Sequence, residues 1–319
     1  MATGLLSLDD LDLPRLTALT ERAVDLFRDR TAHDRPLVGR VAGMMFLQTS
    51  TRTRTAFSSA AVRLGADVLT FGPHDLQTNT GESLRDTGRM FAAMLDLVVV
   101  RTNQPTARLR ELSEDGLAVV NAMSAEEHPT QGLNDLAALR MCFGELTGLR
   151  LLYVGEGNST ATALARALAM VPGCHTTFWT PPGYGLEPDL VLRCDSTAAR
   201  AGGSVVQVSS VDELPSETDV VYTTRWQTTG TAKADPMWRE TFRPYHVDAA
   251  LLARWPKAVV MHDLPAHRGE EISAEVLDGE QSLAWLQGAM KMASAMAVLE
   301  SIGRDIDTHG GHAAGFSRP

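Results

Sequence analysis

Hydroxyl and guanidinium side chains crowd into one short stretch of the sequence, QTSTRTRTAF at positions 48–57. The stretch follows an apolar run that is typical of a buried strand, and a helical pattern at 55–64 comes next. The backbone N–H groups at a helix N-terminus and the helix dipole both favour an anion. Arg52 adds a planar fork of donors that matches a phosphate group. The alternative is that Ser50 or Thr51 is an ordinary N-cap beside solvated arginines.

Further along the chain, residues suited to the same chemistry stand at the ends of expected elements. Arg101 follows the apolar run LDLVVV at 95–100, and ligands of open parallel sheets bind at the carboxyl ends of strands. His128 and Gln131 lie three residues apart at the start of an expected helix, and this spacing places both side chains on one face. A single histidine at such a position is more often a capping or core residue, so the combination of these groups indicates the site.

Together these motifs resemble one family, the aspartate/ornithine carbamoyltransferases. STRTR (50–54), HPTQ (128–131) and HDLPAHRGEE (262–271) follow the family's order, and the resemblance covers nearly the whole chain. It implies two doubly wound parallel-sheet α/β domains, one for carbamoyl phosphate and one for the amino acceptor, with the C-terminal helix crossing back to the first. It also implies an enzyme, an N-carbamoyltransferase, that uses carbamoyl phosphate and no cofactor or metal. The expected assembly is a homotrimer with active sites between subunits.

The resemblance assigns roles on the carbamoyl phosphate side. Arg101 would bridge the phosphate and the carbonyl oxygen, His128 would donate a hydrogen bond to that oxygen, and Gln131 would hold the carbamoyl amide. Thr53, Arg101 and His128 would stabilise the oxyanion formed as a neutral amine attacks, by about 3–4 kcal/mol per donor. The residues expected to be catalytic are Arg52, Thr53, Arg101, His128 and Gln131. The residues expected to bind carbamoyl phosphate are these five, Ser50, Thr51, Gln77 from a neighbouring subunit, and the carbonyl of Leu264 before a cis bond to Pro265.

The acceptor side departs from the ornithine branch of the family. The family's aspartate in its D-x-x-x-S-M-G stretch is Thr224 here, and the cysteine of its HCLP motif is Asp263. TTRWQ at 223–227 resembles instead a stretch of the aspartate branch in which an arginine and a glutamine hold carboxylates. The position of a second carboxylate-binding arginine in that branch is Ala161 here. The sequence therefore does not favour aspartate as the acceptor either. The expected acceptor residues are Asn158, Ser159, Thr224, Arg225, Gln227, Thr228, Thr229, Asp263 and Leu264.

One carboxylate clamp and one added acid predict a zwitterionic amine as the acceptor. Arg225 would bind its carboxylate, and Asp263 would lie near its ammonium. We therefore expect an acceptor other than ornithine or aspartate, for example a short diamino acid such as 2,3-diaminopropionate in secondary metabolism. The alternatives are an ornithine carbamoyltransferase that makes citrulline, and a non-catalytic relative that binds carbamoyl phosphate. For Asp263 itself, the alternative is a local hydrogen bond to the backbone beside Pro265.

The elements that must position these residues alternate between strand and helix, as in parallel α/β sheets. Strand-like runs lie at 41–47, 66–71, 95–100, 117–120, 149–154, 175–180, 204–208, 219–222 and 258–261. Helical patterns lie at 55–64, 82–94, 130–143 and 283–301. The expected parts are a carbamoyl phosphate-binding domain at 1–143 completed by a C-terminal helix at 286–304, an acceptor-binding domain at 148–285, and a mobile tail at 305–319.

Composition limits the class of partner. The 319 residues carry a formal net charge of −10, and an acidic protein attracts neither nucleic acid nor a membrane surface. Three cysteines without CxxC spacing argue against disulfides and zinc, so we expect a reducing cytoplasm and no metal. Glu270 and Glu271 are interpreted as a solvated helix start rather than as metal ligands. The acidic N-terminus and the short apolar runs predict neither a signal peptide nor a membrane span.

Overall fold

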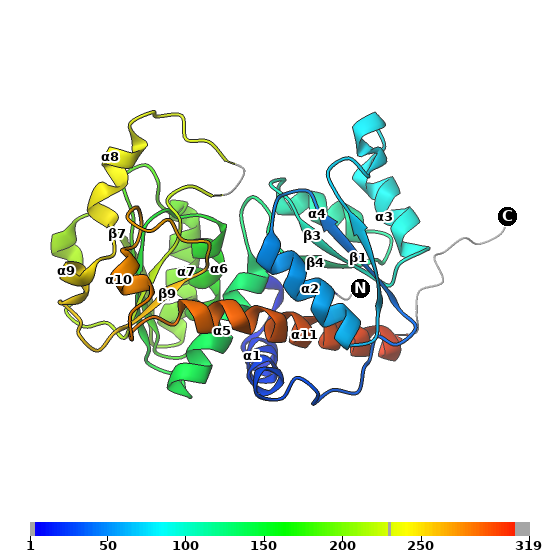
Figure 1. Ribbon diagram of the computed structural model, residues 1–319, viewed down its shortest axis with the longest axis horizontal. Helices are drawn as coiled ribbons and strands as arrows, with labels where there is room; N and C mark the ends of the chain where they lie inside the picture. Colours follow the sequence, from blue (N-terminus) through cyan, green and yellow to red (C-terminus); the bar gives the residue numbers. More distant parts are fainter. Residues whose placement is uncertain (1–3, 229–230, 310–319) are drawn as a thin grey trace. The chain divides into compact units, whose positions relative to one another are not determined.

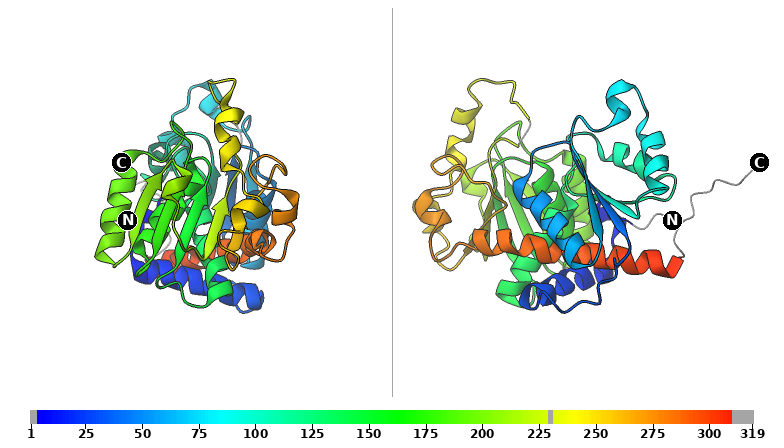
Figure 2. Two further views of the ribbon diagram at one scale, coloured as in Figure 1. Left: turned by 90° about the vertical axis from the view of Figure 1, so that its left-hand side faces the viewer. Right: turned by 45° about the vertical axis from the view of Figure 1, so that its right-hand side comes forward.

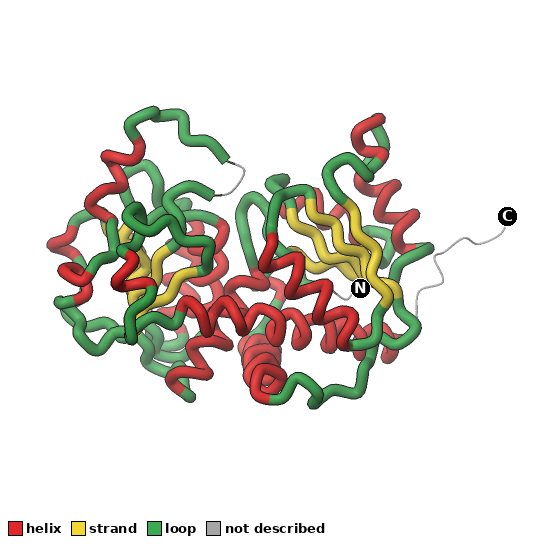
Figure 3. The backbone as a smooth tube through the Cα atoms, in the orientation of Figure 1, coloured by secondary structure: helices red, strands yellow, loops and turns green. Residues whose placement is uncertain are grey.

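Two α/β units make up the chain, and the computed structural model describes residues 4–228 and 231–309. Unit 1 contains the chain up to Ala137 and again from Met290 onward, and unit 2 contains the chain between them. Strands gather into two groups, each flanked by helices (Figure 3). The expected fold class, two parallel-sheet α/β domains with the last helix returning to the first, is confirmed.

Both changes of unit fall inside helices. The first lies in α5 (Pro129–Phe143) and the second in α11 (Ala284–His309). The sequence placed its division instead in the segment after residue 143. Among the described helices, none combines the length and the apolar character that crossing a lipid bilayer requires.

Unit 1 is built on a parallel sheet with the strand order β2-β1-β3-β4 in the described residues. Its strands are β1 (Val41–Phe46), β2 (Asp67–Phe71), β3 (Leu97–Arg101) and β4 (Ala118–Asn121), each within two residues of its apolar run. The strand order reverses between β1 and β3, so the carboxyl ends of these two strands mark the point where open sheets bind ligands. Phe46 and Arg101, the last residues of the two strands, are in register.

The helices of unit 1 include one that starts earlier than its apolar pattern predicted. The pattern began at residue 55, but α2 begins at Thr51 and packs along β1 and β2 (Figure 1). STRTR therefore forms the N-cap and first turn of the helix rather than a loop before it. Hydroxyl and guanidinium side chains on this turn hide the apolar periodicity that would have located its start. The other elements are η1 (Leu8–Asp10), α1 (Leu13–Arg28), η2 (Gln77–Thr80), α3 (Leu84–Ala92) and α4 (Thr106–Ser113).

The last helix also extends beyond its expected end. The sequence predicted a mobile tail from residue 305, but α11 continues to His309, so this part of the prediction is wrong. Arg15 pairs with Asp305 at 2.8 Å, and Arg40 pairs with Asp307 at 2.7 Å. These ion pairs favour the helical end because they join it to the rest of unit 1. Residues 310–319 of the expected tail lie outside the described residues.

Unit 2 has a parallel sheet with the order β7-β6-β5-β8-β9 in the described residues, seen in the left view of Figure 2. The order reverses between β5 and β8, which again marks a ligand position at their carboxyl ends. Its strands are β5 (Arg150–Val154), β6 (His175–Trp179), β7 (Ser204–Val208), β8 (Val220–Thr223) and β9 (Val259–His262). Its helices are α6 (Ser159–Met170), α7 (Pro188–Arg200), η3 (Val211–Glu213), α8 (Trp238–Phe242), η4 (Arg243–Tyr245), α9 (Ala249–Leu252) and α10 (Ala274–Leu277).

Candidate active site

The N-terminus of α2 follows β1 at the point where the strand order of unit 1 reverses. Ser50 is the N-cap residue, but its hydroxyl makes no capping hydrogen bond, so the interpretation of Ser50 as an ordinary cap is wrong. Thr51 is exposed, Arg52 is half-buried and Thr53 is buried. The first turn carries no acidic residue, so its N–H groups and the helix dipole favour an anion at this end.

Arg101 and His128 form the buried polar part of this region. Arg101 Nη1 lies 3.4 Å from His128 Nε2, and Thr130 Oγ1 lies 3.3 Å from His128 Nδ1. Burial, Arg101 and the nearby ammonium of Lys291 hold the pKa of His128 well below its ordinary value of 6.5. His128 is therefore neutral at physiological pH, which suits a hydrogen-bonding role rather than a charged one.

Lys291 on α11 is a site residue that the sequence analysis missed. Its Nζ donates to Gln131 Oε1, and Gln131 Nε2 donates to Asp135 Oδ1 at 2.6 Å. These contacts fix the orientation of the Gln131 amide, with its oxygen toward a cation. Lys291 is the only charged residue from 284 to 299, and this isolated charge in an apolar helix was the signal that could have indicated it.

One pocket of unit 1 brings several of these side chains together. His128 and Gln131, whose spacing predicted that they share a face, line it together with Thr53 and Lys291. The other lining residues are Ala56, Phe57, Thr130 and Ala295. The remaining expected residues Ser50, Thr51, Arg52, Gln77 and Arg101 are not among its described lining. Arg101 lies beside the pocket, in contact with the lining residue His128.

Gln77 stands apart from this pocket, at the start of η2, and is exposed. The hydroxyl of Thr80 donates to the Gln77 carbonyl oxygen at 2.8 Å and to its Oε1 at 3.0 Å. Exposure is compatible with a residue that serves a neighbouring subunit. That role stays a prediction.

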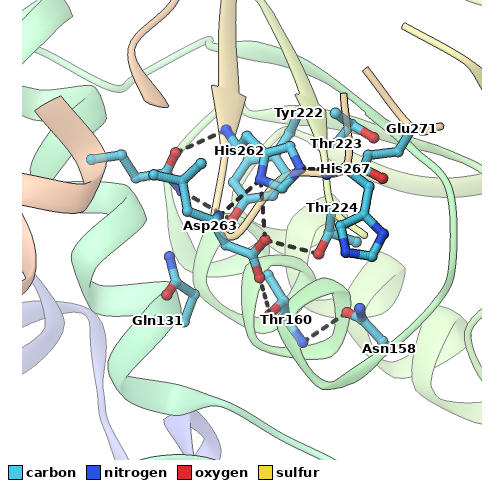
Figure 4. A network of polar contacts seen from close by, with 12 residues as sticks. Gln131, Asn158, Thr160, Tyr222, Thr223, Thr224, His262, Asp263, His267 and Glu271 are labelled. Carbon is cyan, nitrogen blue, oxygen red and sulfur yellow. Dashed lines mark hydrogen bonds and ion pairs between the residues drawn. The ribbon is translucent and has the colours of Figure 1, made fainter. Parts of the chain in front are cut away.

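In unit 2, Asp263 follows β9 and accepts hydrogen bonds from two other elements (Figure 4). Thr224 Oγ1, just after β8, donates to Asp263 Oδ1 at 2.8 Å, and Thr160 Oγ1 on α6 donates to Asp263 Oδ2 at 3.0 Å. The alternative of a local bond to the backbone beside Pro265 is therefore wrong. The side chain of Asp263 is 17% exposed, so the carboxylate is held in place and still reaches the surface of unit 2.

The backbone after Asp263 is fixed by a buried histidine. The N–H of Leu264 donates to His262 Nδ1 at 2.8 Å, so His262 Nε2 carries the proton that it donates to Glu271 Oε1 at 3.0 Å. Leu264 has a φ of 54°, and its peptide bond to Pro265 is cis, as the resemblance implied. Figure 4 shows this contact of His262 with Glu271 behind the Asp263 loop.

The interpretation of Glu270 and Glu271 as a solvated helix start is wrong for Glu271, which is fully buried. Its Oε1 also accepts from the N–H of His267 at 2.6 Å. Within the described residues, His267, Glu270 and Glu271 have ligand atoms within 4.8 Å of one another, close enough for a metal. Glu271 already orients His262 and the backbone through its own hydrogen bonds. The expected absence of a metal stays a prediction.

Asn158 and Ser159 lie where β5 leads into α6. Asn158 is the N-cap of α6, and its Oδ1 accepts from the N–H groups of Thr160 and Ala161 at 3.0 and 3.1 Å. Ser159 is buried in the first turn. Asn158 thus has a structural task in addition to its expected role in binding the acceptor. Gly157, one residue earlier, must lack a side chain because a Cβ there would lie 2.2 Å from the backbone nitrogen of Leu186.

The segment after β8 carries the remaining expected acceptor residues. Arg225 is half-buried, and Gln227 Nε2 donates to the carbonyl oxygen of Thr231 at 2.6 Å. Thr228 Oγ1 lies 3.4 Å from Glu156 Oε2. Thr229 lies outside the described residues. Arg225 remains a group able to bind a carboxylate, whereas the amide of Gln227 is oriented by its own segment.

The polar residues at the start of α2 and around His128 in unit 1 suit an anion attached to a carbonyl group, and unit 2 carries a fixed carboxylate, Asp263. Residues 4–141 match the model of the aspartate/ornithine carbamoyltransferase carbamoyl-P binding domain, and residues 147–302 match that of the Asp/Orn binding domain. The chain therefore belongs to the aspartate/ornithine carbamoyltransferase family.

Several similar proteins are named ornithine carbamoyltransferase. Ornithine carbamoyltransferase of Gloeobacter violaceus is 37% identical over 300 residues, which cover 93% of this chain and 95% of that protein. The enzyme of the same name from Symbiobacterium thermophilum is 38% identical over 272 residues, 84% of this chain and 87% of that protein. The solved ornithine carbamoyltransferase of Pyrococcus furiosus is 30% identical with a TM-score of 0.86, and the match covers 93% of this chain and 96% of that one. These relatives favour the ornithine alternative over the expected non-ornithine acceptor.

The low pKa of His128 predicts how stability changes with pH. The unfolded chain protonates this histidine near 6.5, whereas the folded protein does so only at lower pH. Between the two pKa values the unfolded state binds more protons, so the free energy of unfolding should fall as the pH drops below about 6.5. Urea unfolding between about pH 5 and 7.5 should show this loss, and His128→Gln should reduce it. An imidazole ¹⁵N signal of His128 that titrates at its ordinary pKa would contradict the assignment.

Proposed function

We propose that the chain transfers the carbamoyl group of carbamoyl phosphate to an amino group of ornithine, giving citrulline and phosphate. The observation that carries the proposal is the pocket of Thr53, His128, Gln131 and Lys291 beside Arg101 and the start of α2. Such a site suits an anion attached to a carbonyl group. The names of the relatives support ornithine as the acceptor.

The carbamoyl phosphate half of the reaction follows from the groups of unit 1. The phosphate would lie at the N-terminus of α2 with Arg52, and the carbonyl oxygen would face Thr53, Arg101 and His128. His128 Nε2, which lies 3.4 Å from Arg101 Nη1, would donate a hydrogen bond to that oxygen in the neutral tautomer that carries its proton on Nε2. Gln131 Oε1, oriented by Lys291, has a second lone pair for the carbamoyl NH2.

Chemical balance assigns the remaining steps. The lone pair of a neutral amine attacks the carbamoyl carbon, and the carbonyl oxygen becomes an oxyanion. The oxyanion collapses as the bond from carbon to the phosphate oxygen breaks, and the amine nitrogen loses a proton to the departing phosphate. Arg52, Arg101 and the helix dipole favour the departing phosphate because its negative charge increases as that bond breaks.

The acceptor half rests on Asp263. The family's aspartate position is Thr224 and its cysteine position is Asp263, and in this chain the two side chains are hydrogen-bonded at 2.8 Å. The carboxylate therefore stands after β9 in this chain, where the family has its cysteine. The position after β8, where the family has its aspartate, holds the hydrogen-bonding partner Thr224. We infer that Asp263 supplies the negative charge for an ammonium of the acceptor, so the altered motif is compatible with ornithine.

A short diamino acid such as 2,3-diaminopropionate is the second candidate. It is favoured by Arg225, a half-buried arginine one residue after Thr224, which suits a carboxylate in the aspartate-branch manner.

The two candidates are separated by one assay. Purified protein receives carbamoyl phosphate and either ornithine or 2,3-diaminopropionate, and released phosphate is measured while mass spectrometry detects the added carbamoyl group. Faster turnover of ornithine supports the main proposal, and faster turnover of 2,3-diaminopropionate supports the second. Binding of carbamoyl phosphate without phosphate release from any amine would identify a non-catalytic relative and refute both.

The proposal includes a homotrimer. Leu69 on the edge strand β2 is 51% exposed, and Met90 and Met94 near α3 are 46% and 60% exposed. An apolar sheet edge of this kind favours coverage by another chain. Native mass spectrometry of the assay sample should give the mass of a trimer.

A cytoplasmic location is supported by the buried thiols of Cys174 and Cys194, which are not in disulfides.

A further inference from the structure

Lys233 is buried in unit 2 although it belongs to the segment between β8 and α8. Its side chain is 5% exposed, and its ammonium pairs with Glu156, whose side chain is 18% exposed. The ammonium also lies over the rings of Tyr184, Phe242 and Trp238, at 4.7, 4.8 and 5.4 Å from their centroids. The sequence contains only three lysines, Lys233, Lys257 and Lys291.

Burying an ammonium is unfavourable unless several partners replace its water. Here one carboxylate and several aromatic faces do so, and cation–π contacts are strongest when the cation is desolvated. The rings form part of a cluster with Trp226, which packs against Phe242 with centroids 5.8 Å apart. Lys233 is therefore built into this cluster and is not a surface lysine that happens to lie near it.

The ion pair joins two of the three segments that carry the expected acceptor residues. Glu156 lies after β5, two residues before Asn158, and its backbone oxygen accepts from Tyr153 Oη at 2.6 Å. On the other segment, Trp226 stands between Arg225 and Gln227. A tie between Glu156 and Lys233, together with the packing of Trp226, fixes the position of one segment against the other.

We propose that Lys233 is a positioning residue of the acceptor site. It holds the segment of Arg225 and Gln227 against the β5 end, so that the acceptor's carboxylate meets an arginine already in place. The inference rests on the proposed function of unit 2 and assigns no contact between Lys233 and the substrate.

Kinetics of Lys233→Met test the proposal, because methionine keeps the apolar stem and removes the charge. The expected result is a rise of at least about tenfold in KM for whichever of ornithine or 2,3-diaminopropionate the wild type uses, with KM for carbamoyl phosphate within about twofold. Lys233→Arg keeps the charge and should recover acceptor KM to within about threefold. Lys257→Met, at an exposed lysine, is the matched control and should change neither constant.

An equal rise in the KM values for the acceptor amine and for carbamoyl phosphate, or an unchanged KM for the acceptor amine, would overturn the proposal. If Lys233→Met does not fold, Glu156→Gln removes the other charge and is subject to the same criteria. Failure of the proposed function is distinguishable, because it appears as a wild-type protein that releases no phosphate.

The small number of lysines allows a second readout. In protein labelled with ¹³Cε-lysine, ring currents should shift the Lys233 signal upfield of Lys257, with assignments from the two methionine variants. Carbamoyl phosphate should move the Lys291 signal and leave Lys233 in place. A Lys233 signal at the shift of Lys257 would overturn the proposal even where catalysis is intact, because the ammonium would then lie outside the ring cluster and could not hold the segment.

Discussion

Replacing Arg52 by alanine is expected to lower kcat/KM for carbamoyl phosphate by about 10²–10³-fold. The guanidinium stands in the first turn of α2, where the helix dipole and the N–H groups already favour an anion. Its removal deletes the charged fork that we propose binds the phosphate and favours its departure as negative charge grows there. Initial rates at varied carbamoyl phosphate and saturating acceptor measure the effect.

Arg54→Ala is the matched control for this prediction. Arg54 is two residues further along the same helix and is exposed, so its replacement removes an equal charge away from the pocket. We expect its kcat/KM to stay within about threefold of wild type. Undiminished turnover by Arg52→Ala would refute the phosphate contact. An equal loss in both variants would show that general charge and not a phosphate contact governs binding.

Removing the carboxylate of Asp263 is expected to lower kcat/KM for ornithine about 100-fold, the equivalent of about 2.7 kcal/mol. In Asp263→Cys the hydroxyls of Thr160 and Thr224 lose the carboxylate to which both donate. The ammonium of bound ornithine would lose its negatively charged partner. KM for carbamoyl phosphate should be unchanged, because its proposed side chains belong to unit 1. Steady-state kinetics with each substrate varied in turn measure both effects.

A double-mutant cycle tests whether the carboxylate has exchanged places. Thr224→Asp alone would put a second carboxylate against one that lies 2.8 Å from the present hydroxyl, and the repulsion should impair the enzyme. Thr224→Asp combined with Asp263→Cys restores the aspartate and the cysteine of the ornithine branch at these two positions. We expect the double variant to be more active with ornithine than either single variant, a large departure from additivity. Additive losses would refute the exchange.

Much of unit 1 could be predicted from the sequence because its signals are local. The apolar runs of β1 and β3 give the strands, and their order along the chain places Arg101 at a strand end. His128 and Gln131 share a pocket because three residues of helix bring them to one face. The start of α2 was missed for an equally local reason, since its first turn has no apolar residue to reveal the period.

Tertiary structure alone decided the partners of the functional side chains. Lys291 meets Gln131 across 160 positions of sequence, and Asp263 meets Thr160 across 103 and Thr224 across 39. Strand order creates the last of these contacts, because β8 and β9 are neighbours whose ends bring Thr224 and Asp263 together. Residue patterns record the backbone period and the buried face of each element. They do not record which elements become neighbours, because that depends on packing between segments distant in the chain.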